Sequence, residues 1–190
     1  MLSSLNNVAR PFTYAWASCT ICPMELLEPS LQYLESYKSA LAEFKREGIS
    51  GFWKLFGPID DAEIYLQNIK RYQHRTGLPH DLVPASVYWL TEGDAFIGHV
   101  SIRHELNAAL EELGGHIGYA IRPSKQKQGY GSRLLELALP KAKQLGLQIA
   151  LLTCDKSNVA SRKIIENSGG VLSDEIRVNG KEVLRFWVPL

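Results

Sequence analysis

The sequence is poor in the features that mark specialised classes of protein. Only three of its 190 residues are cysteines, Cys19, Cys22 and Cys154, an odd number and too few for a disulfide framework or a zinc ribbon. Cys19 and Cys22 form a C-x-x-C pair, but no second Cys or His pair accompanies it, so we interpret both as ordinary reduced thiols. We therefore expect no metal site and a reducing, cytoplasmic location.

An excess of either charge is also absent. Lys and Arg number 21 and Asp and Glu number 20, which gives a net charge of +1 at pH 7. A protein without a broad basic field is not expected to bind nucleic acid or an anionic membrane surface. No apolar run reaches the length of a membrane span, and the N-terminus lacks the continuous apolar centre of a signal peptide. Any anion site must therefore be local.

What remains is the composition of an ordinary folded domain. Hydrophobic residues make up 45% of the chain and charged residues 22%, close to the average for soluble proteins. The length suffices to bury one core without disulfides and would be short for two domains. Because residues 1–23 show no periodicity, we predict an N-terminal arm there and a single domain over residues 24–190.

The apolar periodicity predicts helices and strands in a mixed order. Helices are expected from Pro29-Ser30 to Gly48 and from Asp60, in a capping box with Glu63, to about Gly77. The other predicted elements are a hairpin over 87–102, a connection over 104–115, a strand over 116–121, a helix ending at Gly146, a strand over 148–154, a helix over 157–167 and a hairpin turned at Asn179-Gly180. Pro140 should bend or break its helix.

A turn between the strand at 116–121 and the next helix carries the clearest chemistry. In Gln126-Lys127-Gln128-Gly129-Tyr130-Gly131, the glycines permit close approach of a phosphate, and the helix start offers unpaired backbone N–H groups. Ser132 can add a hydroxyl, and Lys125, Lys127 and Arg133 add local positive charge. The turn is neither a P-loop nor a complete dinucleotide-binding fingerprint, and by itself it also fits simple tight turning.

Two distant blocks give the turn a context. The turn itself and the stretch Thr153 to Ser161, continued by Ile164 to Gly170, resemble the GCN5-related N-acetyltransferase (GNAT) superfamily. With the blocks Arg103 to Asn107 and Gly114 to Tyr119, the chain is similar to a subgroup of bacterial predicted acetyltransferases. The resemblance runs from about Met24 to the end of the chain.

The resemblance implies a fold and a cofactor. The fold would be α/β (α+β), a mixed, mostly antiparallel central sheet with helices on both faces. Its fourth and fifth strands would splay apart and hold the pantetheine of acetyl-CoA, and the turn would bind the pyrophosphate. Asn158 matches a pantetheine-contacting position, although it could equally satisfy local backbone. The residues expected to bind the cofactor are Ile121, Arg122, Gln126, Lys127, Gln128, Gly129, Tyr130, Gly131, Ser132, Asn158 and Ser161.

The resemblance also implies direct transfer of an acetyl group from acetyl-CoA to a primary amine, with a backbone N–H of the fourth strand supporting the oxyanion. His116 stands at or next to the family's usual general base, and His104 and Glu105 are rivals. Where many relatives carry a tyrosine as general acid, this chain has Ile165. Tyr119, Tyr130 or a water would then protonate the thiolate.

Other functions stay open at this stage. The chain could be a non-catalytic acyl-CoA-binding or sensing domain, or a nucleotide-phosphate binder that uses the same turn. A nucleophilic role for Cys154 beside His116 is disfavoured, because no orienting third group is evident. The acceptor would be a small-molecule or peptide amine, and Glu105, Glu111 and Glu112 could attract its charge or simply be solvated. A homodimer is expected from the family alone.

Overall fold

The structure is a computed structural model that describes residues 23–49 and 61–190. The arm predicted over residues 1–23, apart from its last residue, and the Cys19 and Cys22 pair lie outside the described residues. So do most of the loop predicted between the first two helices and Asp60 of the predicted capping box.

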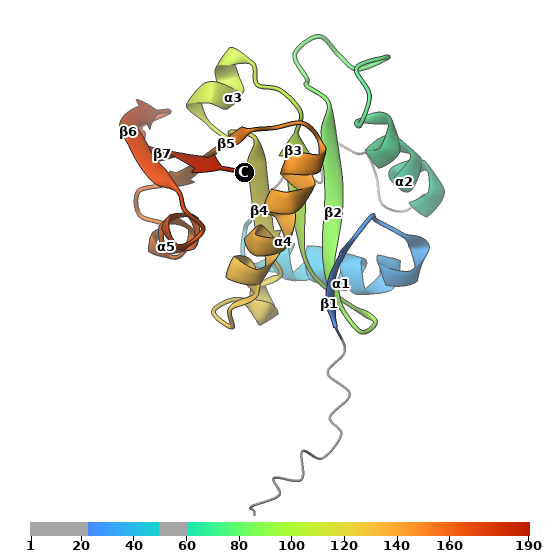
Figure 1. Ribbon diagram of the computed structural model, residues 1–190. Helices are drawn as coiled ribbons and strands as arrows, with labels where there is room; N and C mark the ends of the chain where they lie inside the picture. The colour runs from blue at the N-terminus through green and yellow to red at the C-terminus, as the bar shows by residue number, and fades with distance from the viewer. Residues whose placement is uncertain (1–22, 50–60) are drawn as a thin grey trace, which may run out of the picture.

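In the described residues, seven strands form two antiparallel sheets (Figure 1). The first sheet has the order β1-β2-β3-β4 and the second the order β5-β7-β6. Their bounds are β1 (Met24–Leu27), β2 (Ala85–Glu92), β3 (Ala95–Arg103), β4 (Ile117–Ile121), β5 (Ile149–Asp155), β6 (Val171–Val178) and β7 (Lys181–Pro189). The sequence pattern does not predict β1, because four residues show too little alternation.

Helices cover both faces of the first sheet (Figure 1). On one face, α1 (Leu34–Arg46) and α2 (Ala62–Arg71) pack with Trp89 and Phe96 into one apolar cluster. On the other, α4 (Tyr130–Gln144) packs on β3 and β4, and α5 (Val159–Asn167) joins the same cluster. Two 3₁₀ turns (Leu31–Tyr33 and Pro123–Lys125) and a short α3 (Ala108–Glu112) complete the elements. The predicted mixed fold with helices on both faces is confirmed.

Local details correct several boundaries. The described cap of α2 is Asp61, whose carboxylate accepts a hydrogen bond from the N–H of Ile64 at 3.0 Å. The helix ends at Arg71, well before the predicted stop at Gly77. α4 continues through Pro140 without a break. The predicted final turn is confirmed, since Asn179 and Gly180 both have positive φ, as a type I′ hairpin requires.

Candidate active site

Hydrogen bonds join β5 to His116, the residue that immediately precedes β4. The N–H of His116 donates to the carbonyl of Leu151 at 2.7 Å, and the N–H of Leu151 donates to His116 Nδ1 at 2.9 Å. A Cβ on the preceding Gly115 would lie 2.2 Å from the Leu151 carbonyl oxygen, and its φ is +61°. Only glycine fits this approach, so the junction depends on Gly115 as well as on His116.

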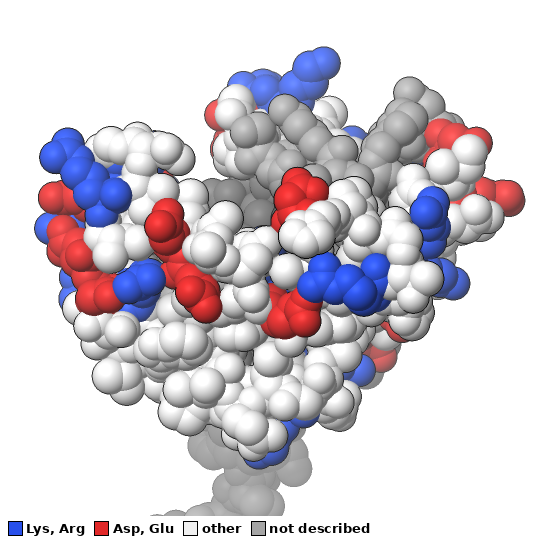
Figure 2. All heavy atoms as spheres, turned by 90° about the horizontal axis from the view of Figure 1, so that it is seen from above, with Lys and Arg blue, Asp and Glu red and all other residues white. Residues whose placement is uncertain are grey.

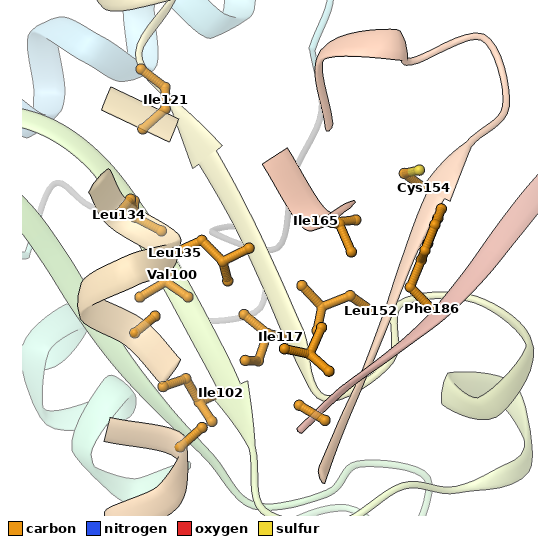
Figure 3. Packing of buried hydrophobic residues seen from close by; sticks show 14 of the residues in the cluster. Val100, Ile102, Ile117, Ile121, Leu134, Leu135, Leu152, Cys154, Ile165 and Phe186 are labelled. Carbon is orange, nitrogen blue, oxygen red and sulfur yellow. The ribbon is translucent and has the colours of Figure 1, made fainter. Parts of the chain in front are cut away.

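Beyond this junction the two strands diverge. They belong to different sheets, and in the described residues no ladder of hydrogen bonds joins them. Figure 3 shows the strands separating from Ile117 and Leu152 toward Ile121 and Cys154, with Ile165 of α5 packed between them. The predicted splay between the fourth and fifth strands is confirmed.

The splay leaves backbone groups of β4 available. The N–H of Arg122 donates to the carbonyl of Ile97 at 2.9 Å, so these two residues form a bonded pair between β3 and β4. Bonded positions alternate along an antiparallel ladder, so Ile121, Tyr119 and Ile117 turn their N–H and C=O groups away from β3. Those groups face the splay, where an extended amide chain such as pantetheine can pair with them, apart from the carbonyl of Ile121, which has a partner of its own.

Backbone groups at the C-terminal end of β4 have hydrogen-bond partners within the protein. The carbonyl of Ile121 accepts a hydrogen bond from Gln126 Nε2 at 3.1 Å. Because the N–H of Arg122 is bound within the sheet, it is not available to the cofactor, contrary to our expectation. Its side chain instead donates from Nε to Glu43 of α1 at 2.9 Å. The hydrogen bond from Arg122 is the main reason that the pKa of the partly buried Glu43 is lowered to about 2.

A cleft of about 240 Å³ occupies the splay. Its walls come from the end of β3, the loop before β4, β4 itself, β5 and the start of α5. The lining residues are Arg103, Leu113, Gly114, Ile117, Gly118, Tyr119, Leu152, Thr153, Cys154, Asn158 and Ser161.

The turn before α4 has the geometry of an anion site. Gly129 is the N-cap with φ +88°, and no side chain caps the helix, so the N–H groups of residues 130–132 have no partner within it. A Cβ on Gly129 would meet nothing within 4 Å, so only its conformation demands glycine. A Cβ on Gly131 would lie 2.8 Å from Ile164 Cδ1, so that glycine lets α4 approach α5. The open helix start suits the pyrophosphate.

Side chains around the turn are held in place. The hydroxyl of Tyr130 donates to Glu92 at 2.8 Å, and this hydrogen bond raises the pKa of Tyr130. Lys125 Nζ lies 5.8 Å from the centre of the Tyr130 ring, and Gln128 Nε2 donates to the Ser124 carbonyl at 3.1 Å. Tyr130 does not line the cleft, which argues against its use as the general acid.

Tyr119 bridges the splay from β4 to α5. Its hydroxyl lies 3.1 Å from Ser161 Oγ, and either group can donate. Burial raises the pKa of Tyr119, so the hydroxyl keeps its proton at neutral pH. Ser161 precedes Ile165 by one helical turn, and the Ile165 side chain is buried in the core. The hydroxyl of Tyr119 on β4 thus contacts α5 one turn before the position where the resemblance leads us to expect a tyrosine.

The side chain of Asn158 both caps α5 and lines the cleft. Its Oδ1 accepts a hydrogen bond from the N–H of Ser161 at 3.0 Å and caps α5, as the local interpretation of this residue predicts. The residue also lines the cleft, so its amide NH₂ is available to a ligand. Both roles can therefore belong to the same side chain.

His116 is poorly placed to act as a base. Because Nδ1 accepts the N–H of Leu151, the proton of the neutral ring belongs on Nε2, and neither nitrogen offers a free lone pair. Burial, with a further contribution from Arg103, lowers the pKa of His116. His116 does not line the cleft, so this geometry favours a role in holding β4 against β5.

The two rival bases are not brought to the cleft either. His104 Nε2 lies 2.9 Å from the hydroxyl of Ser86, and burial lowers its pKa, with a contribution from His74. Glu105 forms an exposed ion pair with Arg75. Neither residue lines the cleft. Sequence reasoning overlooked Arg103, which does line it, because a single arginine at the end of a strand carries no motif.

On the face seen in Figure 2, acidic and basic side chains are interspersed and no broad patch of one sign forms. Residues 23–49 and 61–190 contain no group of three or more His, Cys, Asp or Glu side chains that could hold a metal ion. None of the helices in these ranges has both the length and the apolar character to cross a bilayer.

Comparison with known sequences identifies a family. The profile of the Acetyltransferase (GNAT) family matches residues 50–169, more than half of the chain. No curated protein sequence matches significantly.

Solved structures share the fold. yncA of Salmonella typhimurium, with its cofactor acetyl-CoA, aligns with TM-score 0.60 and 12% identity over 88% of this chain and 94% of that one. RimL, a ribosomal L7/L12 alpha-N-protein acetyltransferase in complex with coenzyme A, aligns with TM-score 0.62 and 17% identity over 90% of this chain and 98% of that one. The spermidine/spermine N-acetyltransferase SpeG of Vibrio cholerae aligns with TM-score 0.57 and 16% identity over 88% of this chain and 95% of that one. Identities this low show a common fold.

Proposed function

Since the chain belongs to the acetyltransferase (GNAT) family, and is thus an acetyl-CoA-dependent acyltransferase, we propose that it acetylates a primary amine by direct transfer. The observation that carries the proposal is the cleft between β4 and β5, together with the open start of α4 into which the chain leads after the C-terminal end of β4. The acceptor is a small molecule or a peptide. RimL and SpeG, which share the fold, act on a protein α-amine and on a polyamine respectively.

Acetyl-CoA supplies an activated acyl carbon, and the protein supplies position and protons. N–H groups of residues 130–132 bind the pyrophosphate, and Asn158 contacts the pantetheine arm. The N–H of Tyr119 or Ile117 stabilises the negative charge that develops on the carbonyl oxygen. The hydroxyl of Tyr119, held by Ser161, donates its proton to the departing sulfur and regains one, through water, from the nitrogen that has attacked the acyl carbon.

The acceptor amine must lose a proton before it can attack the acyl carbon. Among the described residues that line the cleft, none is a carboxylate or an imidazole. The amine therefore enters uncharged or loses its proton to water. An α-amine, with a pKa of about 8, meets this condition more readily near neutral pH than a lysine-type amine, with a pKa of about 10.4.

Calorimetric titration tests the proposal. The protein should bind acetyl-CoA in preference to ATP and NAD, and Gly129→Glu should abolish this binding, because it places a carboxylate and a strained backbone at the open start of α4. Gly146→Glu is the matched control. Gly146 follows the other end of α4, has φ +95° and is equally open, so it suffers the same strain without touching the turn. Unchanged binding by Gly129→Glu would refute the assignment of the turn.

A second candidate is a non-catalytic acyl-CoA-binding domain. It is favoured by the buried Ile165 at the usual acid position and by the lack of a base among the described lining residues. The two candidates differ in turnover. A panel of amines that releases no free CoA thiol from a protein that binds acetyl-CoA would favour the binding domain.

The remaining parts of the proposal concern organisation. Residues 24–190 act as one acyltransferase domain with residues 1–23 as an arm. The location is cytoplasmic, where the free thiol of Cys154 stays reduced. Size-exclusion chromatography with light scattering would decide between a monomer and the homodimer that the family suggests.

A further inference from the structure

Arg103 places a positive charge in the wall of the cleft. Its Nη1 donates to the carbonyls of Gly114 and Gly115, at 3.1 and 2.9 Å. The guanidinium lies over Gly118 of β4, since a Cβ there would come within 4 Å of three of its atoms, the nearest at 3.5 Å. The two carbonyls hold the guanidinium at Nη1. Because Gly118 has no side chain, it does not cover the flat face of the guanidinium.

The charge of Arg103 is not neutralised within the described residues. No carboxylate pairs with it there, and no hydrogen bond uses its Nε or Nη2. Glu105, two residues further along the chain, is paired with Arg75. Burial lowers the pKa of Arg103, but a guanidinium stays charged at neutral pH. A partly desolvated cation with free donors is an incomplete ion pair, which an anionic ligand would complete.

The cofactor phosphates are too far away to be that ligand. Arg103 contacts the start of β4, whereas the turn that suits the pyrophosphate follows its end. The five residues of β4 separate the two points by roughly 13 Å, at about 3.3 Å per residue. The anion must therefore come from the other substrate, which enters the same cleft.

We propose that the acceptor amine carries a carboxylate and that Arg103 binds it. Nε and Nη2 lie on one edge of the guanidinium and match the two oxygens of a carboxylate in a bidentate pair. This pair would fix the acceptor with its nitrogen directed along β4 toward the thioester. The inference rests on the proposed function and narrows it to amino acids, or to peptides that place a carboxylate near the amine.

The test uses matched pairs of amines. Glycine, β-alanine, 4-aminobutyrate and 6-aminohexanoate are compared with their carboxamides, both as acceptors in CoA release and as ligands in calorimetry with and without CoA. For the chain length that fits, we expect the acid to exceed its amide by about 10- to 100-fold in kcat/KM and in affinity, the usual effect of a charged hydrogen bond. Arg103→Gln should remove this preference, and Arg103→Lys should retain part of it.

Controls separate this inference from the proposed function. Acetyl-CoA affinity should be the same in wild type and Arg103→Gln, and Arg177→Gln, an exposed change on β6, should behave as wild type. If acetyl-CoA does not bind to the wild type, the proposed function fails. The comparison of affinities for each amino acid and its carboxamide still decides the role of Arg103. Equal affinity for every acid and its amide, a preference that survives Arg103→Gln, or tighter binding of aminoalkyl phosphonates would each overturn the carboxylate assignment.

Discussion

The two ends of β4 present different chemical groups to a ligand. At its C-terminal end, the groups that suit the cofactor are backbone N–H donors, presented by a helix start and a glycine conformation. From its N-terminal end to its middle, the groups are side chains from separate elements: Arg103 of β3, Tyr119 of β4 and Ser161 of α5. Backbone recognition suits a ligand that never changes, whereas side chains can be exchanged to suit a particular acceptor.

The comparison makes the N-terminal end the more vulnerable to mutation. Its geometry depends on the junction between β4 and β5, which one glycine and one histidine maintain. The C-terminal end has many equivalent donors, so the loss of one side chain there should matter less.

Gly115→Ala should have the largest effect. The new Cβ would lie 2.2 Å from the Leu151 carbonyl oxygen, and the backbone has φ +61°, so both a clash and conformational strain oppose it. We expect a loss of about 3–5 kcal/mol in the free energy of unfolding, measured by chemical denaturation. Gly169→Ala is the control, because its φ is +86° but its Cβ would meet nothing. That variant should lose only about 1 kcal/mol. Equal losses would mean that the close approach is unimportant.

Tyr119→Phe should lower kcat by about 10- to 100-fold and leave the KM for acetyl-CoA nearly unchanged, because it removes a proton donor without removing the ring. The matched control is Tyr130→Phe, whose hydroxyl is bound to Glu92 outside the cleft. It should keep most of its activity. Steady-state CoA release with a working acceptor measures both. Full kcat in Tyr119→Phe would leave water as the acid.

The difference between the two ends also explains how far the sequence alone could lead. The conformation of the turn before α4 was predictable because glycine spacing after a strand records a backbone conformation directly in the sequence. The order of helices and strands was predictable for the same reason, since apolar periodicity is a local property. β1 was too short to show such a pattern.

The pairing of side chains around the N-terminal half of β4 was not predictable, because these residues meet only after folding. His116 looked like a base from its position, yet its Nδ1 faces the N–H of Leu151, a contact that crosses 35 residues of sequence. Tyr119 and Ser161 meet across 42 residues. Such pairs leave no local spacing in the chain. Arg103 stands alone at the end of β3 and gains meaning only from the cleft around it.

Glu43→Gln probes the link between α1 and the residues that follow the C-terminal end of β4. The folded pKa of Glu43, about 2, lies below the ordinary value of 4.5, so its ionised form stabilises the fold above pH 4.5 and this contribution declines as the pH falls toward 2. We expect the variant to lose about 2 kcal/mol at neutral pH, the scale of a charged hydrogen bond. The difference from wild type should shrink between pH 4.5 and 2. A constant difference across that range would rule out the ionised pair with Arg122 as its cause.

Asn158 offers the smallest and most selective test, because one side chain would serve both the fold and the cofactor. Asn158→Ala should cost about 1 kcal/mol through the lost cap of α5 and weaken acetyl-CoA binding by roughly 2- to 10-fold through the lost amide. Asn158→Asp separates the two effects, since it keeps a capping oxygen and removes the NH₂ donor. It should restore the free energy of unfolding and leave the affinity low. If Asp restores both, the residue is only a cap, and the pantetheine arm depends on the backbone of β4 alone.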